Sequence, residues 1–455
     1  MQPIQDDRPV DAKFEELVEV TRAAMEEARV PGLSIGMVAG GQEFTAGLGV
    51  TSITNPLPVT AETLFQIGST TKTFTATAVM RLVEQGMLNL DDRVRKYLPG
   101  FKVADPEAGE QVTLKMLLTH TPGWLGDFFP ECGMGDDALA RFTDQMADLA
   151  QQTPVGRIYS YNNAALVLAG RIIEVVTGKP YEEAMSELIL APLEMNNSFF
   201  FPADVMVHRF SVGHYLDGEN VIVATPWPVP RFAAPAGGIT SDALDQIKYM
   251  RFCMGDGLTA KGERLLTPES MRLMKTPMAP QGDGSWVGLT WTINDLNGVK
   301  IYNHGGTTYG QESDFWYAPE QGVALTVMTN LDRGDIAHKA ARKWAWEHFL
   351  GVVEQFPQTQ DLPAAQLAEY KFTCLTSTGD SLNISPNDGG ILITHRLQTE
   401  DQSGALPPMQ ARFFEKDHFL VLEGIFENAK GEFLRRDDGS IGWMRLGGRI
   451  QRRAE

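Results

Sequence analysis

The stretch Ile67-Gly-Ser-Thr-Thr-Lys-Thr-Phe-Thr-Ala-Thr-Ala-Val-Met-Arg-Leu-Val-Glu-Gln-Gly86 decides how the rest of the chain is interpreted. Its apolar residues recur at helical spacing, at Phe74, Ala78, Val79, Leu82 and Val83. The pattern predicts one helix that ends at Gly86. Ser69 lies near the N-terminal end of this helix. Lys72 follows three residues later, so the hydroxyl and the ammonium share one face.

This pair has the residue types that nucleophilic catalysis needs. A serine hydroxyl is a weak nucleophile until a base takes its proton. A lysine can act as that base when burial or a neighbouring cation lowers its pKa. The helix N-terminus adds free N–H groups and a partial positive charge where an oxyanion would form. Taken alone, Ser-x-x-Lys more often marks an N-cap serine and a solvated lysine, so the rest of the sequence must decide.

The composition restricts the class of protein. The 455 residues are 43% hydrophobic and 21% charged, which predicts an ordinary globular chain of two or three domains. A net charge of −19 argues against nucleic acid or an anionic membrane as the main partner. The cysteines, Cys132, Cys253 and Cys374, are far apart and show neither a disulfide framework nor a zinc spacing. No metal and no cofactor are therefore expected.

The sequence also carries a prediction of location. It has no run of about 18 apolar residues, which a membrane helix would need. Its first residues, Met-Gln-Pro-Ile-Gln-Asp-Asp-Arg, are polar and acidic, unlike a signal peptide. We expect a soluble cytoplasmic protein, or a periplasmic or secreted one if a signal has been removed.

The order of the predicted elements indicates an α/β fold. A helix and two strands come first, at residues 11–28, Leu33–Ala39 and Glu43–Val50. Strand patterns return at Val287–Ile293, Val299–His304, Asp314–Tyr317 and Val323–Thr329, followed by a helix at Ile336–Leu350. This order predicts an antiparallel sheet flanked by both terminal helices. A mostly helical subdomain, about residues 87–255, is inserted between the strands.

The inserted subdomain has recognisable parts. An apolar helix is expected at Asn163–Val176, and another from about Asp242 to Cys253 with Ser241 as its cap. Residues 125–137 are rich in glycine, proline and aromatic residues, which is typical of a lid or a pocket wall.

The chain is expected to divide into a catalytic domain over residues 1–355, a linker over 356–363 and a C-terminal domain over 364–455. Short strands are predicted in the last part at Ser381–Ser385, Ile391–His395, Gln410–Phe414, Phe419–Glu423, Phe433–Arg435 and Trp443–Leu446. They predict a small, separate antiparallel β-barrel.

Several motifs stand in a fixed order: Ser69-Thr-Thr-Lys72, Leu117-Leu-Thr-His-Thr-Pro-Gly123, Tyr161-Asn-Asn163, Pro235-Ala-Gly-Gly-Ile-Thr-Ser241 and His304-Gly-Gly306. With them the sequence resembles the superfamily of serine β-lactamases, penicillin-binding proteins and related esterases and D-aminopeptidases, over roughly residues 14–350. The C-terminal barrel resembles the lipocalin-like domain of some of its members. We expect the barrel to shape substrate access, or else to serve in packing or oligomerisation.

The resemblance implies roles for the residues of the first two motifs. Ser69 would be the nucleophile and Lys72 its proton-transfer partner. Tyr161 would exchange protons with the nucleophile and the leaving group, and Asn163 would bind the acyl amide of the substrate. Ser160-Tyr-Asn162 also matches the Ser-x-Asn variant of the motif. The Tyr161 frame is preferred because Gly156 lies five residues before it, and Tyr159 is expected to be a packed aromatic residue.

The motif His304-Gly-Gly306 departs from the Lys-Thr-Gly of most β-lactamases, as it does in many esterases and D-aminopeptidases. Gly305 and Gly306 would let substrate approach the strand. The N–H groups of Ser69 and Thr307 would form the oxyanion hole. His304 is either a site residue or a packed strand histidine. A neutral histidine cannot replace the lysine that holds a β-lactam carboxylate, so β-lactams are expected to be poor substrates.

Other motif matches have structural interpretations. We expect His120 and Gly237-Gly238 to serve packing beside the site. Gly32-Leu-Ser-Ile-Gly36 matches the Gly-x-Ser-x-Gly elbow of α/β-hydrolases. That elbow needs a strand before its serine and a helix after it, whereas a helix precedes Ser34 and a strand continues through it.

The expected function is therefore a serine hydrolase that works through a Ser69 acyl-enzyme. Its substrates would be small-molecule or peptide amides or esters, including D-amino-acid peptides or peptides without a free carboxylate. The alternatives are an acyltransferase or peptide-cyclising thioesterase, a β-lactamase, and a catalytically silent penicillin-binding-like sensor. A homo-oligomer is compatible with the sequence.

Overall fold

An eight-stranded antiparallel sheet forms the centre of the first 350 residues, in the order β2-β1-β12-β11-β10-β9-β8-β7. The computed structural model describes residues 6–376, 380–399, 405–424 and 426–454. The strands are β1 (Gly32–Ala39), β2 (Gln42–Gly49), β7 (Ala279–Pro280), β8 (Trp286–Val287), β9 (Thr292–Leu296), β10 (Val299–Thr307), β11 (Glu312–Ala318) and β12 (Val323–Thr329). Because β1 pairs with β12, the N-terminal hairpin joins the strands that come after the insertion.

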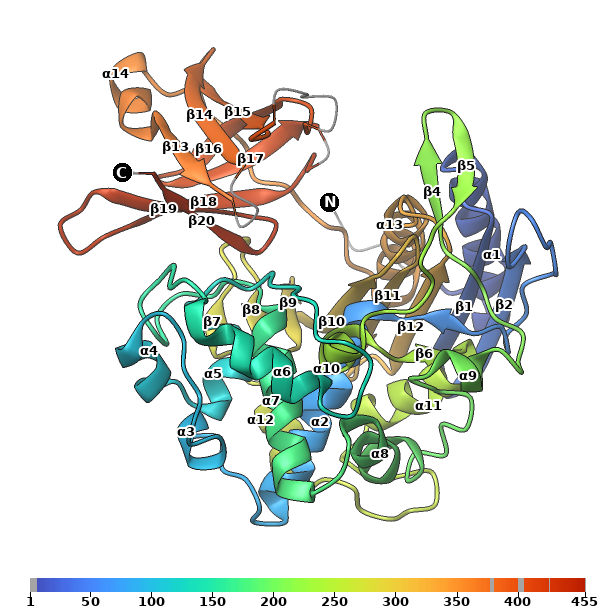
Figure 1. Cartoon of the computed structure of the whole chain (residues 1–455). Coiled ribbons are helices and arrows are strands. Elements are labelled where there is room, and N and C mark those ends of the chain that lie inside the picture. Colours follow the sequence, from blue (N-terminus) through green and yellow to red (C-terminus); the bar gives the residue numbers. More distant parts are fainter. Residues whose placement is uncertain (1–5, 377–379, 400–404, 425, 455) are drawn as a thin grey trace.

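The terminal helices α1 (Val10–Glu27) and α13 (Asp335–Ala345) lie side by side against one face of the sheet (Figure 1). Each presents an apolar stripe to a core shared with β1, β11 and β12. The stripes consist of Phe14, Leu17, Ala24 and Met25 on α1, and of Ala337, Ala341 and Trp344 on α13. The predicted closing helix continues beyond α13 as a π-helical turn, Trp346–Leu350.

The other face of the sheet carries α11 (Ala243–Met254) and the long helix α2 (Thr71–Glu84), beside the helical subdomain (Figure 1). The remaining helices here are α3 (Val94–Tyr97), α4 (Pro106–Gln111), α5 (Leu114–Leu118), α6 (Ala138–Gln145), α7 (Asn163–Thr177), α8 (Tyr181–Met185), α9 (Pro202–Val205), α10 (Ala234–Gly237) and α12 (Pro268–Met274). Two small sheets accompany them: β3 (Phe65–Gln66) with β6 (Thr240–Ser241), and the hairpin β4 (His214–Asp217) with β5 (Asn220–Val223).

Three details differ from the sequence predictions. The helix that carries Ser69 begins with a 3₁₀ turn, Gly68–Thr70, before α2. The cap of α11 is Asp242, whose carboxylate accepts a hydrogen bond from the N–H of Asp245 at 2.8 Å, because Ser241 lies in strand β6. The predicted strand Val287–Ile293 is two strands, β8 and β9, separated by a turn in which Thr290 has a φ of 68°.

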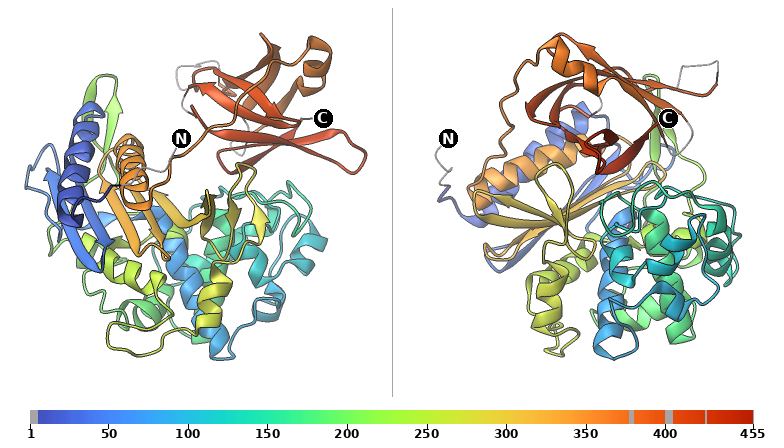
Figure 2. Two further views of the ribbon diagram at one scale, coloured as in Figure 1. Left: turned by 180° about the vertical axis from the view of Figure 1, so that it is seen from behind. Right: turned by 90° about the vertical axis from the view of Figure 1, so that its left-hand side faces the viewer.

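The C-terminal part is a closed antiparallel barrel of β13 to β20 in sequence order (Figure 2). Its strands are β13 (Phe372–Leu375), β14 (Ser381–Asn387), β15 (Gly390–Arg396), β16 (Met409–Glu415), β17 (His418–Glu423), β18 (Lys430–Arg435), β19 (Ile441–Leu446) and β20 (Arg449–Arg453), preceded by α14 (Ala364–Leu367). The strands β13 and β20 are absent from the predicted set. A core of stacked rings, including Phe413, Phe419 and Phe433, fills the interior.

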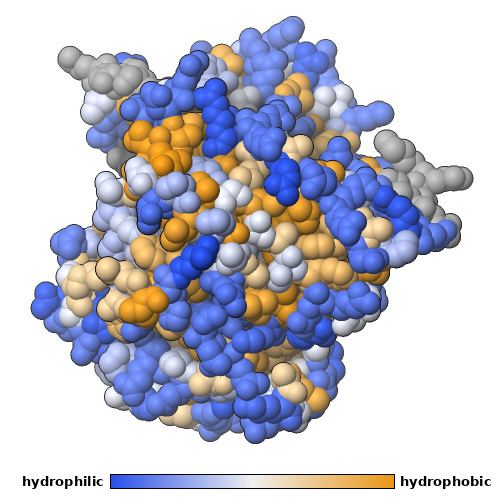
Figure 3. All heavy atoms as spheres, turned by 90° about the vertical axis from the view of Figure 1, so that its right-hand side faces the viewer, coloured by the Kyte–Doolittle hydropathy of each residue, from blue (hydrophilic) through white to orange (hydrophobic). Residues whose placement is uncertain are grey.

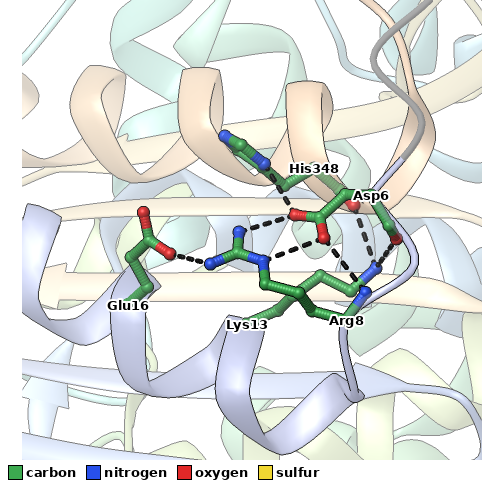
Figure 4. Close-up of polar contacts among 5 residues, drawn as sticks. All are labelled: Asp6, Arg8, Lys13, Glu16 and His348. Atoms are coloured by element: carbon green, nitrogen blue, oxygen red, sulfur yellow. Dashed lines mark hydrogen bonds and ion pairs between the residues drawn. The ribbon is translucent and has the colours of Figure 1, made fainter.

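A cluster of polar side chains ties the start of α1 to the end of the closing helix (Figure 4). The Asp6 carboxylate accepts hydrogen bonds from Arg8 at 2.6 Å and from His348 at 2.8 Å. Lys13 donates to the carbonyl groups of Asp6 and His348 at 2.9 and 3.2 Å, and Arg8 also pairs with Glu16. Residues near both ends of the sheet domain are thereby held together.

The surface is mixed in character. On the face toward α1 and β2, hydrophilic residues surround separate apolar patches (Figure 3). None of the helices in the described part of the chain combines the length and the apolarity that crossing a bilayer requires.

Candidate active site

Ser69 and Lys72 meet at the start of α2. The Lys72 Nζ lies 2.9 Å from the Ser69 Oγ and donates a second hydrogen bond to the carbonyl of Ala236 at 2.6 Å. Ala236 belongs to α10, which places the predicted Pro235–Ser241 motif against the lysine. Lys72 is completely buried, so its amine has exchanged water for two protein oxygens.

This environment changes the proton affinity of Lys72. Burial lowers the pKa of Lys72 well below its usual range, and the charge of Arg449 lowers it further, while Asp127 raises it. A lysine with a lowered pKa reaches its neutral form at a lower pH. That neutral amine is the form that can take a proton from the Ser69 hydroxyl.

Tyr161 faces the same pair from the segment that leads into α7. Its ring centroid is 5.0 Å from the Lys72 Nζ, and Tyr161 and Ser69 line the same cavity. Burial raises the pKa of Tyr161, so the hydroxyl keeps its proton and can donate it. The neighbouring Ser160 hydroxyl instead accepts a hydrogen bond from the Ile450 N–H of the barrel at 3.2 Å. The geometry therefore presents Tyr161 to the nucleophile and turns Ser160 away from it.

His120 supports the tyrosine. Its ring stacks on that of Tyr161 with centroids 4.8 Å apart, and its Nδ1 accepts a hydrogen bond from the Asn162 N–H at 3.0 Å. Burial lowers the pKa of His120 well below its usual range, so the ring is neutral. These contacts agree with a structural interpretation of His120.

The strand β10 forms the opposite wall and carries His304. The His304 Nδ1 lies 2.6 Å from the carbonyl oxygen of Gly305, which can only accept a hydrogen bond. The proton is therefore on Nδ1, and Nε2 remains an acceptor. Burial, with a smaller contribution from Lys72, lowers the pKa of His304 to about 3. This histidine supplies no positive charge near neutral pH.

The backbone of β10 passes very close to the turn that holds Ser69. A Cβ atom on Gly306 would lie 1.9 Å from the Ile67 carbonyl oxygen and 2.7 Å from the Ser69 nitrogen. A Cβ on Gly68 would lie 2.6 Å from the Thr307 nitrogen, and Gly68 has a φ of 49°. The glycines thus bring the amides of Ser69 and Thr307 close together, as an oxyanion hole requires.

The third wall contains Asp127, a carboxylate that the sequence analysis does not single out, bonded to two other residues of the site. Asp127 accepts a hydrogen bond from the Asn163 side chain at 2.7 Å. It also accepts hydrogen bonds from Arg449, at 2.6 Å from Nε and 3.3 Å from Nη2. The Arg449 Cζ lies 5.0 Å from the Tyr161 ring centroid. The site therefore contains a permanent cation, and the barrel supplies it.

The barrel reaches the site through the β19–β20 hairpin, whose turn is Gly447-Gly448 with φ values of 58° and 74°. Four hydrogen bonds fix this hairpin to the segment before α7: Tyr161 N to Gly448 O at 2.8 Å, Ile450 N to Ser160 Oγ at 3.2 Å, Arg445 Nη1 to Tyr159 O at 2.8 Å, and Trp443 Nε1 to Gln152 O at 2.8 Å. The hairpin therefore forms part of the wall of the candidate site.

A cavity of about 1330 Å³ runs between the sheet domain and the barrel. Ser69, Tyr161, His304 and Arg449 lie in its wall, which extends to the start of α13 and to residues 353–356. Its size is sufficient for a peptide substrate. Among the described residues, no group of three or more His, Cys, Asp or Glu side chains is arranged to hold a metal ion.

The two other motif matches, Gly32–Gly36 and Gly237-Gly238, have structural roles. Ser34 is fully buried in the middle of β1. Gly237 packs against Gly68, and a Cβ on Gly238 would lie 2.7 Å from the Ala234 Cα. Both glycines serve close backbone packing.

Comparison with known proteins gives the following matches. The Beta-lactamase family model matches residues 13–347. Penicillin-binding protein 4 of Amycolatopsis lactamdurans is 36% identical over 314 residues, which cover 67% of this chain and 82% of that protein. The octameric penicillin-binding protein homologue from Pyrococcus abyssi is 26% identical, with a TM-score of 0.66, over 97% of this chain and 99% of that one. The crystal structure of SurE matches with a TM-score of 0.79 and 24% identity, over 98% and 100% of the two chains, which shows a shared fold.

Proposed function

The chain belongs to the Beta-lactamase family, and from this premise we propose that it is a serine hydrolase that forms an acyl-enzyme on Ser69. The observation that carries the proposal is the contact of 2.9 Å between the Ser69 hydroxyl and a completely buried lysine. The hydrogen-bond partners of this amine, the Ser69 hydroxyl and the Ala236 carbonyl, are both uncharged, and burial favours the neutral form that can accept a proton.

The proposed reaction uses the side chains of Ser69, Lys72 and Tyr161 and the backbone N–H groups of Ser69 and Thr307. Neutral Lys72 takes the Ser69 proton while the oxygen attacks the substrate carbonyl. The negative charge that develops on the carbonyl oxygen is held by the N–H groups of Ser69 and Thr307. Tyr161 gives a proton to the leaving amine or alcohol as the carbonyl–leaving-group bond breaks, and the proton that Lys72 took from Ser69 passes to Tyr161 in its place. Water then gives one proton to Lys72 as its oxygen attacks the ester, and that proton returns to the Ser69 oxygen as the acyl group leaves as a carboxylic acid.

The proposed substrates are amides or esters, including small peptides with D-residues. The neutral His304 disfavours β-lactams, because their carboxylate would meet an imidazole acceptor at the strand position where most β-lactamases carry lysine. Arg449 does not replace that lysine, because two of its nitrogens are engaged by Asp127 on another wall.

Labelling by a fluorophosphonate probe tests the proposal. We expect the probe to attach to Ser69, as located by mass spectrometry, and to leave Ser69→Ala unlabelled. A panel of p-nitrophenyl esters, D- and L-aminoacyl anilides and nitrocefin then defines the substrate class. Absence of labelling, or a label on another serine, would overturn the assignment and favour a catalytically silent binding protein.

Acyl transfer is the second candidate function, and the size of the cavity supports it. A space of about 1330 Å³ that continues past Ser69 can hold an amine or alcohol nucleophile as well as an acyl chain. The same acyl-enzyme would then give a ligated or cyclised peptide instead of an acid. Adding an amine to a turnover reaction and measuring the ratio of amide to acid distinguishes the two reactions.

The octameric state of the Pyrococcus abyssi homologue supports the proposal that this chain also assembles with copies of itself. Light scattering on a size-exclusion column measures its mass directly. A monomeric mass would exclude assembly under those conditions.

A further inference from the structure

We propose that the barrel completes the active site electrostatically, with Arg449 and Asp127 acting as positioning residues that set when Lys72 can accept the proton of Ser69. This inference rests on the proposed acyl-enzyme chemistry. According to this inference, the barrel takes part in the proton transfer between Ser69 and Lys72, although both residues belong to the sheet domain.

The geometry that carries the proposal centres on the Tyr161 ring. The Arg449 Cζ and the Lys72 Nζ each lie 5.0 Å from the centroid of that ring, so the two cations are at most about 10 Å apart. The Arg449 side chain is 42% exposed, and at that distance two charges near a protein surface interact strongly enough at low ionic strength to move a pKa by about one unit. Arg449 cannot move away freely, because two of its nitrogens are bonded to Asp127.

The other groups that face Lys72 carry no charge near neutral pH. His304 on β10 has a pKa lowered to about 3, and burial lowers the pKa of His120 after α5 well below its usual range. Burial raises the pKa of Tyr161, which keeps its proton. Among the described residues, Arg449 and Asp127 are the charged groups that perturb the lysine.

The two residues act on Lys72 with opposite signs. Arg449 repels the ammonium form and so lowers the pKa of Lys72, whereas Asp127 attracts it and raises the pKa. Activity should rise with pH as Lys72 loses its proton, because the neutral amine is the base. The midpoint of this acidic limb therefore reports the local charge balance.

The test is the pH dependence of kcat/KM for a neutral p-nitrophenyl ester, which has no carboxylate for Arg449 to bind. We expect Arg449→Met to shift the acidic limb to higher pH by about one unit. Asp127→Asn should shift it to lower pH, because the arginine then acts unopposed. The double variant should lie between the two single variants.

Two further variants serve as controls. Arg449→Lys keeps the charge, so its limb should remain near that of the unmodified protein even if kcat falls. Arg453→Met removes a cation from the same strand, where it contacts Phe372 and the Ile441 carbonyl, and should leave the limb in place.

The outcomes separate this inference from the proposed function. If Ser69 is labelled in every variant and the limbs coincide while kcat falls, Arg449 and Asp127 have only a packing role and the inference is wrong. If Arg449→Met unfolds, Arg449→Lys and Asp127→Asn still decide the question. If the unmodified protein acylates Ser69 at no pH, the proposed function itself fails.

Discussion

Two walls of the candidate site are built in different ways. The α2 wall takes Ser69 and Lys72 from a single helical turn, and their contact follows from a spacing of three residues. The barrel wall joins Asp127 to Arg449, which are 322 positions apart in the sequence. The first wall holds the groups that exchange atoms with substrate. The second holds charged groups that surround them without reacting. Substitutions in the two walls should therefore lower activity to different extents.

The largest effect is expected on the α2 wall. Ser69→Ala should lower kcat by ~10⁴-fold or more, and Lys72→Ala should be comparably severe because nucleophile and base act as a unit. The measurement is single-turnover ester hydrolysis together with probe labelling. A correctly folded variant of the barrel wall that lowered kcat by as much would contradict the expected difference between the two walls.

Tyr161 lies between the walls and should show an intermediate effect. Tyr161→Phe keeps the stacking with His120 but removes the hydroxyl, so turnover should fall by about 100-fold with little change in thermal stability. Tyr159→Phe is the matched control. The hydrogen bond from Arg445 goes to the backbone carbonyl of Tyr159, so removing the Tyr159 hydroxyl leaves that bond in place. Unchanged turnover in Tyr161→Phe would assign the proton transfer to another group.

A smaller effect is expected at the strand wall. His304→Lys should raise the ratio of kcat/KM for nitrocefin to that for a neutral ester by about tenfold, because a charge-assisted contact replaces a neutral acceptor. In the unmodified protein this ratio should be similar at pH 6 and pH 8, since the pKa of His304 is lowered to about 3. An unmodified protein that hydrolyses nitrocefin as efficiently as its best ester would contradict this account.

The smallest effect is expected on the outer part of the barrel wall. Trp443→Phe removes one hydrogen bond to the Gln152 carbonyl and keeps an aromatic ring, so kcat/KM should fall about two- to fivefold. Steady-state kinetics with the neutral ester measures the loss. Full activity would mean that the remaining three contacts of the hairpin are sufficient to hold the segment before α7.

The sequence predicts the α2 wall because its information is local. Helical periodicity places Lys72 beside Ser69, and glycines mark the strand that must approach them. The antiparallel sheet with terminal helices and the C-terminal barrel are confirmed, because the strand and helix patterns that predict them are local, even though β1 pairs with the distant β12. The roles of Ser69, Lys72, Tyr161, Asn163, His304 and Thr307 stay predictions, which the arrangement of these residues supports.

The barrel wall could not be predicted in this way. The strand β20 reads Arg-Ile-Gln-Arg-Arg, and a single apolar residue gives no strand pattern. Asp127 lies in a segment without periodicity, for which the sequence predicts a lid or a pocket wall but no particular functional residue. The pairing of Asp127 with Arg449 of β20 depends on how the two domains pack, and no local sequence pattern specifies that packing. The sequence does not predict the break between β8 and β9, because Thr290, at a φ of 68°, is not a typical turn residue.

The Gly447-Gly448 turn is a position at which substrate selectivity could be changed. It is the tip of a hairpin anchored in a separate barrel, so its sequence can change without altering any residue of α2 or β10, provided that the Gly448 carbonyl and Arg449 keep their places. Residues inserted at this tip would enter the cavity next to Tyr161. A protein engineer who wishes to alter selectivity while preserving the reaction therefore has a short, addressable segment to randomise. The same separation would allow the substrate range to change while Ser69 and Lys72 stay in place on α2.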